Sequence, residues 1–305
     1  MEGLVFRSTG LWYDVRSPNG KQIRCRLRGK LRLSGSRITN PVAVGDRVEV
    51  EPEHDDSGII TRVWPRDNYI IRKSTRKSHH GHIIAANIDL AVLIASFTFP
   101  RTSLGFIDRF LVAAESFRIP AKIIFNKSDL LTPDQLELQQ FLQEMYDDIG
   151  YENILISAVK DDGFDSVMNW LFQKKTLLSG HSGVGKSTLL NRLDPSLMIP
   201  TNEVSTFADK GIHTTTFATM YELGNETYVI DTPGIKELGL LEMENWEISH
   251  YFPEMRELLG NCRFNNCLHI NEPGCAVLNA LRDGKIPELR YESYLGMIDE
   301  KDNRR

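Results

Sequence analysis

The sequence predicts a multidomain α+β fold, with a small β-barrel, a parallel α/β domain and a helical C-terminal domain in that order. Three observations predict it: short alternating strands fill residues 1–73, strands and helices alternate from Asp89 onward, and three of the four cysteines lie within fourteen residues. A chain of 305 residues is long for one core, so two or three domains are expected. We predict the boundaries 1–73, 74–238 and 239–305.

The front segment is typical of a small barrel of about five strands. Apolar or bulky residues alternate with charged ones in VFRSTGLWYDVRS, KQIRCRLRGKLRLS, VGDRVEVEP and SGIITRVWP, and Pro18-Asn19-Gly20 is a turn signal. An OB-type barrel fits this length and commonly binds oligonucleotides, although an SH3-like barrel has nearly the same signature. We interpret Cys25 as a small buried side chain.

Charge is unevenly distributed along the chain. The net charge is −5, yet residues 1–77 hold 16 Lys and Arg against 9 Asp and Glu. A basic front on an acidic chain indicates a polyanionic partner, and a basic solvated face is the alternative. No apolar stretch approaches the roughly 20 residues that span a bilayer, and the first residues lack a secretory signal pattern, so we expect a cytoplasmic protein.

Residues 74–86 resemble a polar connector. His79, His80 and His82 lie close together in it. A metal site is one interpretation of this trio, but a solvated linker or a phosphate-contacting loop is favoured.

From Asp89 the pattern predicts a doubly wound α/β domain. Continuous apolar runs at 90–97, 121–125, 153–158, 176–179 and 227–230 predict buried strands. Helical patterns follow the first four of them: SLGFIDRFLVAAESF, PDQLELQQFLQEMYDDIG, DSVMNWLFQ and STLLNRL. In such folds, ligands bind in loops at the carboxyl ends of the strands.

One of these loops matches the P-loop pattern in full: Gly180, His181, Ser182, Gly183, Val184, Gly185, Lys186 and Ser187. Its glycines let backbone N–H groups point at phosphate oxygens, and the following helix adds the positive end of its dipole. We expect Lys186 to reach the β- and γ-phosphates and Ser187 to bind Mg²⁺, with Thr188 also at the nucleotide.

Two further segments fit a nucleoside triphosphate site. Asp231-Thr232-Pro233-Gly234 follows a predicted strand, 45 residues after Lys186. Asp231 can hold Mg²⁺ through water, and the N–H of Gly234 can sense the γ-phosphate. Between the two motifs lies GIHTTT at 211–216, where a threonine hydroxyl can complete the Mg²⁺ shell and leave it after hydrolysis.

The loop Asn126-Lys127-Ser128-Asp129 predicts guanine recognition. The Asp129 carboxylate can accept from N1–H and the exocyclic amine of guanine, a donor pair that adenine lacks. Lys127 can lie along the base and Asn126 can brace the loop. A backbone N–H at Ser157 or Ala158, which end the next strand, could meet the guanine O6. The sequence thus predicts GTP rather than ATP.

The motif order is unusual, because the guanine motifs precede the P-loop. A circularly permuted GTPase domain explains this order. Ile235 stands where small Ras-like GTPases place a glutamine that orients the attacking water. Since an apolar side chain cannot polarise water, His213 is the nearest candidate in sequence for this role, with a structural role in its loop as the alternative.

A cysteine and histidine cluster near the end predicts a structural zinc site. Cys262, Cys267, His269 and Cys275 supply three thiolates and one imidazole, which is a full tetrahedral set. No ligand position is left for water, so the site is not expected to be catalytic.

These motifs in this order, followed by C-x4-C-x-H-x5-C, resemble the RsgA (YjeQ) family of GTPases that depend on the small ribosomal subunit. The resemblance covers essentially the whole chain and includes residues 86–89 and 272–277. It implies an N-terminal OB-fold, a circularly permuted P-loop GTPase domain and a C-terminal zinc-binding domain. His213 then corresponds to the proposed catalytic histidine, and Thr215 to the threonine linked to Mg²⁺.

The resemblance also implies a function in late maturation of the small ribosomal subunit. GTP/GDP, Mg²⁺ and one structural Zn²⁺ are the implied ligands, and the subunit with its rRNA is the implied partner. The protein would bind in the GTP state and leave on hydrolysis, as a monomer without a membrane partner. A GTP-gated RNA-binding module with incidental hydrolysis is one alternative. A small-molecule kinase is another, and the guanine loop argues against it.

Overall fold

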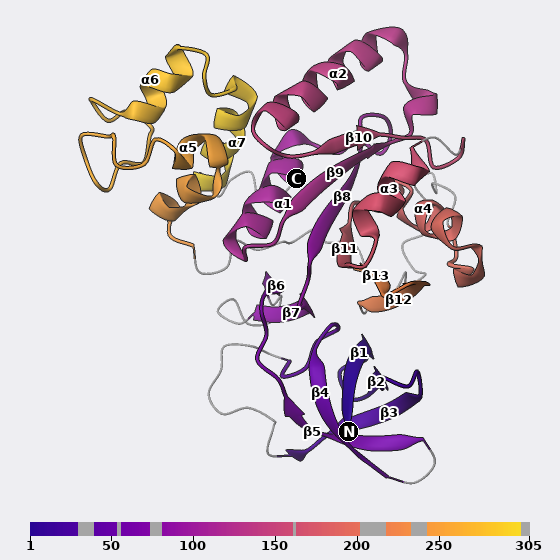
Figure 1. The fold of residues 1–305 in the computed structure, drawn as a ribbon. Coiled ribbons are helices and arrows are strands. Elements are labelled where there is room, and N and C mark those ends of the chain that lie inside the picture. Colours follow the sequence, from indigo (N-terminus) through magenta and orange to yellow (C-terminus); the bar gives the residue numbers. More distant parts are fainter. Residues whose placement is uncertain are drawn as a thin grey trace, which may run out of the picture.

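The computed structural model of the chain places the barrel, the α/β domain and the C-terminal helices in sequence order (Figure 1). The structure describes residues 1–29, 40–53, 56–73, 81–160, 163–201, 218–232 and 243–299. Several residues with predicted roles lie outside these ranges: His79, His80, His213, Thr215, Gly234 and Ile235. Within the described ranges, no helix is both long and apolar enough to cross a membrane.

The N-terminal part is a five-stranded barrel, which confirms the sequence prediction. Its strands are β1 (Glu2–Ser8), β2 (Tyr13–Arg16), β3 (Gln22–Leu27), β4 (Arg47–Pro52) and β5 (Ser57–Val63). The strand order is β1–β2–β3–β5–β4, and β4 closes the barrel by pairing with β1. Val5, Val15 and Ile60 point inward at alternate positions, and Cys25 is fully buried among them.

One alternating run in the sequence becomes two strands in the structure. Residues 5–17 are divided between β1 and β2 by a turn, in which the N–H of Thr9 donates to the carbonyl of Trp12 at 2.9 Å. Gly10 has a φ of +84° there, a conformation that glycine adopts without steric cost. The run therefore forms a hairpin.

The segment expected to be a connector contains a strand. β6 (Tyr69–Lys73) and β7 (Gly81–Ala86) form an antiparallel pair next to the barrel. Ile70 of β6 and Ala85 of β7 are buried, because this pair packs against the core of the α/β domain. His82 lies on β7 in register with Arg72.

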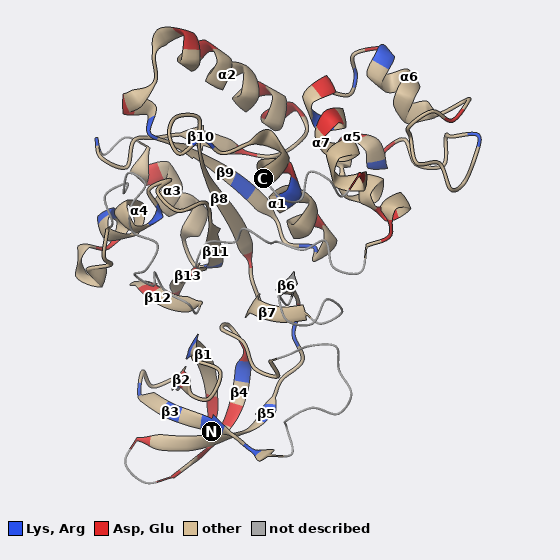
Figure 2. Ribbon diagram, turned by 180° about the vertical axis from the view of Figure 1, so that it is seen from behind, with Lys and Arg blue, Asp and Glu red and all other residues tan. Residues whose placement is uncertain are grey.

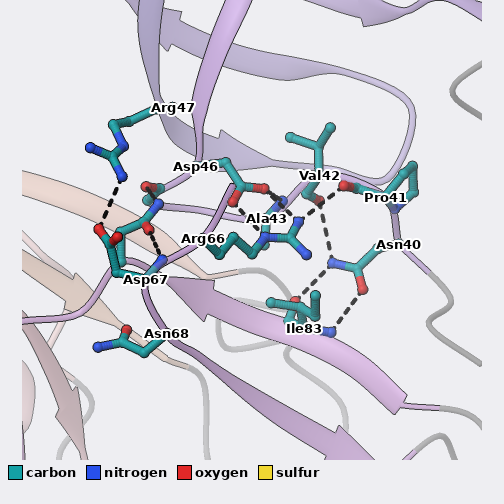
Figure 3. A network of polar contacts seen from close by, with 12 residues as sticks. Asn40, Pro41, Val42, Ala43, Asp46, Arg47, Arg66, Asp67, Asn68 and Ile83 are labelled. Atoms are coloured by element: carbon teal, nitrogen blue, oxygen red, sulfur yellow. Dashed lines mark hydrogen bonds and ion pairs between the residues drawn. The ribbon is translucent and has the colours of Figure 1, made fainter. Parts of the chain in front are cut away.

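Polar contacts fix the barrel to β7. The buried carboxylate of Asp46 accepts two hydrogen bonds of 2.7 Å from Arg66, whose guanidinium also donates to the carbonyl of Pro41 at 3.0 Å (Figure 3). The amide of Asn40 donates to the Ile83 carbonyl and accepts from the Ile83 N–H, both at 2.8 Å (Figure 3). Charge-assisted and paired amide bonds of this kind hold the junction in one geometry.

The α/β domain has a mainly parallel sheet in the order β10–β9–β8–β11–β13, with β12 antiparallel at the end. The strands are β8 (Leu90–Ser96), β9 (Ala121–Asn126), β10 (Asn153–Leu155), β11 (Lys175–Ser179), β12 (Thr219–Gly224) and β13 (Thr227–Asp231). All seven residues of β8 are buried, as expected for a central parallel strand. β10 is shorter than predicted, and β12 has no counterpart among the predicted strands.

Helices cover both faces of this sheet. They are α1 (Leu104–Ser116), α2 (Pro133–Asp148), α3 (Phe164–Leu171) and α4 (Lys186–Leu193), with short 3-10 helices at Ser128–Leu130 and Pro195–Leu197. Leu93 of β8 faces the core shared with α1 and α2, whereas Ile94 faces the core shared with α3 and α4. This alternation confirms the doubly wound architecture.

The C-terminal part consists of short helices around the cysteine cluster. They are a 3-10 helix (Asn245–Tyr251), α5 (Pro253–Arg256), α6 (Ala276–Arg282) and α7 (Glu288–Ile298). Their core includes Val112 of α1, so α1 belongs to two cores at once. Figure 1 shows these helices beside α1 and away from the barrel.

A buried charge cluster joins α7 to α1. Arg290 is 0% exposed and donates to Asp108 at 2.5 Å and to Glu254 at 2.8 Å. Tyr146 of α2 donates to the same Asp108 oxygen at 2.9 Å. Burial raises the pKa of Asp108 and the Arg290 charge opposes that effect. Removing Arg290 would leave carboxylates buried without a cation, so the cluster persists only as a unit.

Candidate nucleotide site and metal centre

The P-loop begins where β11 ends, at Gly180. A Cβ at this position would lie 2.5 Å from the carbonyl oxygen of Ile94, so a side chain cannot be accommodated. Gly183 and Gly185 have φ values of +82° and +99°, which L side chains rarely adopt. A Cβ on Gly185 would also lie 2.3 Å from the amide nitrogen of Asn126. The glycines are therefore required by packing as well as by backbone conformation.

The loop continues directly into α4. The first residues of this helix are Lys186, Ser187 and Thr188, whose N–H groups lie at the positive end of the helix dipole. The amine of Lys186 donates to the carbonyl of Gly180 at 3.3 Å, which directs the lysine back along the loop. This arrangement can bind an oligophosphate.

Asp231 lies at the end of β13, in a parallel pair with Leu178 of β11 just before the P-loop. Burial raises the pKa of Asp231, and the charge of Lys186 opposes this shift. One carboxylate oxygen of Asp231 is buried and has no hydrogen-bond partner among the described residues. Next to it, the Thr232 hydroxyl donates to the Leu178 carbonyl at 3.2 Å and fixes the chain. A cation or polar ligand near Lys186 would satisfy this carboxylate.

Asn126 connects three loops of the site. Its amide nitrogen donates to the carbonyl of Val184 in the P-loop at 2.8 Å. Its amide oxygen accepts from the N–H of Ala158 at 2.9 Å. The side chain is buried at the end of β9. The structure therefore brings the predicted guanine loop, the loop after β10 and the P-loop together.

The rest of the guanine loop is held by its own backbone conformation and by the side chain of Ser157. Lys127 has a left-handed conformation with a φ of +72°, and the Ser157 hydroxyl donates to the Asp129 carboxylate at 2.7 Å. The N–H of Ala158, one of two groups expected at the guanine O6, is bonded to Asn126 here. Asp129 keeps a second oxygen for other donors, so the loop can accept from a base.

Two contacts of the site were not predicted from the sequence. The ring of His181 lies 3.9 Å from that of Phe106 in α1, at 34° between the planes. The Lys127 amine donates to the carbonyl of Phe99 at 3.0 Å, and burial lowers its pKa while Asp129 raises it. Both phenylalanines follow the carboxyl end of β8, and this position could have indicated from the sequence that they lie near the site.

The four predicted metal ligands converge. Ligand atoms of Cys262, Cys267, His269 and Cys275 all lie within 4.8 Å of one another. Nδ1 of His269 is 3.7 Å from Sγ of Cys262 and 3.3 Å from Sγ of Cys275, and those sulfurs are 4.0 Å apart. Ligand atoms around a tetrahedral Zn²⁺ are separated by roughly 3.8 Å for Zn–S bonds of about 2.3 Å. The geometry fits zinc.

The surroundings of the cluster also suit a metal. The N–H groups of Ala276 and Leu278 donate to the sulfurs of Cys262 and Cys275, at 3.3 and 3.4 Å. Burial raises the pKa of Cys267 to about 12, so a cation is needed to keep this thiolate charged. Burial also lowers the pKa of His269, which keeps its imidazole neutral and able to ligate.

Hydrogen bonds from α7 hold the metal-binding loop. The hydroxyl of Tyr291 donates to the carbonyl of His269, and that of Tyr294 donates to the carbonyl of Leu268, both at 2.7 Å. The Glu272 carboxylate accepts from the N–H groups of Leu268 and Ile270 at 2.6 and 2.8 Å. These contacts hold the backbone on both sides of His269.

Comparison with known proteins agrees with this geometry. A family model described as RsgA GTPase matches residues 63–241, and one described as RsgA N-terminal domain matches residues 2–60. A small ribosomal subunit biogenesis GTPase RsgA from Cytophaga hutchinsonii is 50% identical over 307 residues, and the match covers 100% of both chains. The protein of that name from Bacteroides fragilis (strain YCH46) is 47% identical over 302 residues, covering 99% of this chain and 97% of its own.

Solved structures give the same result. YjeQ from Thermotoga maritima is 34% identical with a TM-score of 0.79, and the match covers 100% of this chain and 99% of that one. YloQ, described as a circularly permuted GTPase, is 30% identical with a TM-score of 0.74, covering 100% of this chain and 96% of that one. The permuted motif order, the Cys3His cluster and these matches lead to one conclusion: the chain belongs to the RsgA GTPase family and is a GTP hydrolase with a circularly permuted GTPase domain.

Proposed function

We propose that this protein acts in the biogenesis of the small ribosomal subunit, binds the subunit in the GTP state and leaves it after hydrolysis. The observation that carries the proposal is the Asn126 bridge, which unites a phosphate loop and a guanine loop in a chain that aligns fully with relatives named for this function. The proposal includes a cytoplasmic monomer with the three domains 1–73, 74–238 and 239–305.

In this proposal the nucleotide lies along the carboxyl edge of the sheet. Backbone N–H groups of the P-loop and the Lys186 amine hold the phosphates. Asp129 accepts from the guanine, Lys127 lies along the base, and Ser157 positions the carboxylate with its 2.7 Å hydrogen bond. Asp129 thereby excludes adenine, because its half-buried carboxylate would face an adenine ring that lacks the N1–H and 2-amino donors of guanine.

We place Mg²⁺ beside Ser187, Asp231 and Thr215. When bound by these residues, Mg²⁺ would supply positive charge at the β- and γ-phosphate oxygens. Asp231 fits this role because one of its carboxylate oxygens is buried and has no hydrogen-bond donor among the described residues. The charge of Lys186 also lowers the pKa of this carboxyl, which favours its ionised form. The hydroxyl of Ser187 stands in the first turn of α4, where it can reach a cation bound to the phosphates.

Hydrolysis needs a group that removes or orients the proton of the attacking water. Ile235 cannot do so, and we assign this role to His213 when the subunit has docked. Turnover without the partner would then be slow, because only the docked partner would hold the histidine in its catalytic position. Stimulation by the small subunit is therefore the expected kinetic signature of this site.

The barrel is the proposed contact with rRNA. Figure 2 shows basic residues along β3. The indole of Trp12 lies beneath two guanidinium groups, those of Arg24 at 4.6 Å and Arg26 at 4.7 Å. Cationic and aromatic groups together bind phosphates and stack on bases. The zinc domain, held on α1 by Arg290, would give a second rigid surface to the subunit.

The testing experiment is GTP turnover of the full chain with and without purified small ribosomal subunits. We expect strong stimulation by small subunits and none by an equal mass of large subunits. Equal turnover in all three conditions would contradict the proposal.

The basic barrel also fits a second candidate, a GTP-gated RNA-binding module whose hydrolysis is incidental. A single-turnover release assay separates the two. The proposed cycle requires retention on the subunit with a non-hydrolysable GTP analogue and release with GTP. The binding-module alternative predicts the same rate of release in both cases.

A further inference from the structure

The barrel is attached directly to the strand pair that ends at the nucleotide site. Arg7 of β1 is in antiparallel register with Thr219 of β12, and Thr219 is in register with Asp231 of β13. Strands in a sheet are about 4.8 Å apart, so roughly 10 Å separates the barrel backbone from the residue proposed to hold Mg²⁺. The barrel and the α/β domain thus share one continuous sheet.

Among the described residues, the contact at this seam includes Phe6 and Arg16 from the barrel and Glu222 and Tyr228 from the hairpin β12–β13. Arg16 makes an ion pair with Glu222, and its guanidinium lies 4.3 Å from the ring centroid of Phe6. The ring of Phe6 meets that of Tyr228 edge to face at 5.9 Å. Glu222 and Tyr228 are themselves register partners across the hairpin. Arg16 therefore contacts a side chain on each side of the seam.

The seam is narrow. A cavity of about 910 Å³ lies next to it, between the barrel and the base of the sheet, and its lining includes Leu4, Trp64, Gln173 and Lys175. The second attachment is the junction at residues 40–46, where Asn87 donates to the Gly45 carbonyl at 2.9 Å. Open space lies between these two attachments. A small rotation of the barrel about the junction at residues 40–46 would therefore move the β12–β13 hairpin through its contacts with β1.

We propose that Arg16 and Glu222 are positioning residues that transmit docking of the barrel to the β12–β13 hairpin and so to Asp231. This inference rests on the proposed function, since it takes the barrel as the subunit-binding part and Asp231 as part of the nucleotide site. The ion pair is partly exposed, and pairs of that kind contribute little to stability. The pair matters for geometry, because it links the partner-binding barrel to a strand that borders the site.

The test compares Arg16→Ala, Glu222→Ala and the double charge reversal Arg16→Glu with Glu222→Arg. Arg47→Ala is the matched control, because Arg47 lines the same cavity and pairs with Asp67 at 2.9 Å without contacting the hairpin. Basal GTP turnover and GTP affinity should stay unchanged in all variants. Stimulation by small subunits should fall about fivefold in each single variant, the lower end of typical allosteric couplings.

The charge reversal separates positioning from loss of basic charge. If the pair acts by geometry, the reversal restores most of the stimulation while Arg47→Ala never loses it. If Arg16 only adds positive charge for RNA, the reversal stays defective and Arg47→Ala is defective too. Full stimulation in both single variants would also overturn the inference.

A second measurement does not need the subunit. Hydrogen exchange of β1 amides in the full chain is compared with GDP and with a non-hydrolysable GTP analogue. We expect nucleotide-dependent protection in the wild type, its loss in Arg16→Ala and its return in the charge reversal. A wild type that is not stimulated by subunits but shows this exchange pattern would refute the proposed function alone. A wild type whose β1 exchange ignores the nucleotide refutes the inference.

Discussion

The side-chain amide of Asn126 donates to the carbonyl of Val184 across 2.8 Å, and this bond ties the guanine loop to the P-loop. The same side chain accepts from the N–H of Ala158, so one residue sets the spacing between the base-reading and phosphate-holding parts of the site. Because the side chain is buried, both backbone groups depend on it for satisfaction.

Asn126→Ala should therefore weaken binding of GTP and GDP equally. Leaving buried backbone groups unpaired costs about 1–3 kcal/mol, which corresponds to roughly a fivefold to 150-fold loss of affinity. Asn191→Ala is the matched control, since Asn191 also makes two backbone bonds, of 2.7 and 2.8 Å, to Ile199 of the segment after α4. Nucleotide titration of both variants checks the prediction, and equal losses would contradict it.

Asp129→Asn should shift nucleotide preference from GTP towards xanthosine triphosphate. An amide cannot accept from both N1–H and the amine of guanine, but it can pair with the 2-oxo group of xanthine. Competition binding with both nucleotides measures the change. Ser157→Ala should weaken GTP binding without changing this preference, because it removes the 2.7 Å bond that positions the carboxylate but leaves the carboxylate itself. Unchanged GTP preference in Asp129→Asn would show that another group reads the base.

Local chemistry made the motifs predictable. The P-loop needs glycine where a Cβ would meet Ile94 or Asn126, and this requirement is visible as a sequence pattern. The alternation of apolar residues likewise predicted the barrel, and a continuous apolar run predicted the buried strand β8. Burial on one face of a strand gives a period of two residues, and burial on both faces gives an unbroken apolar run.

Long-range pairing could not be predicted in the same way. β12 is held by β13 on one side and by β1 on the other, and its register with Arg7 joins residues more than two hundred positions apart. Arg and Asp are residue types usually found at the surface, so the sequence does not indicate that Arg290 and Asp108 are buried; their mutual contact explains it. The 3.9 Å stacking of Phe106 on His181 depends on helix placement and has no pattern of its own.

Cys267→Ser should release zinc and destabilise the part after residue 243, while the nucleotide site is retained. Structural zinc contributes folding free energy that short helices cannot replace. Metal analysis of purified protein, together with GTP binding, checks this. Cys25→Ser is the control: that thiol is buried in the barrel, outside the cluster, so one zinc per chain should remain. Wild type without zinc would contradict the assignment.

His213→Ala should reduce subunit-stimulated hydrolysis much more than GTP affinity. Ile235 offers no polar group to water, so the proposal needs the histidine once the partner has docked. Ordering such a group in activator-stimulated GTPases contributes roughly 10³–10⁵ in rate. Basal turnover should change less. Stimulated turnover and affinity are measured side by side with the wild type, and undiminished stimulation would transfer the role to a group of the subunit.

Arg290→Met should loosen the C-terminal part from the GTPase domain and release zinc at lower urea concentration. The substitution leaves Asp108 and Glu254 buried without their cation, and breaking a buried pair costs about 3–5 kcal/mol. Arg256→Met is the matched control, because Arg256 pairs with Glu115 of α1 at 2.8 Å in the same interface but is half exposed. An exposed pair contributes about 0–1 kcal/mol, so this control should resemble the wild type.

The zinc readout follows from the contacts of α7. Tyr291 and Tyr294 lie on the same helix as Arg290 and donate to the carbonyls of His269 and Leu268, so a loosened α7 removes two bonds from the metal-binding loop. Zinc release is followed with a chromogenic chelator during the urea titration, and GTP binding is followed in parallel. If the cluster is the link between the domains, zinc is lost before GTP binding in Arg290→Met. Simultaneous loss of both at the wild-type midpoint would mean that the apolar contacts of Val112 and its neighbours suffice to hold the interface.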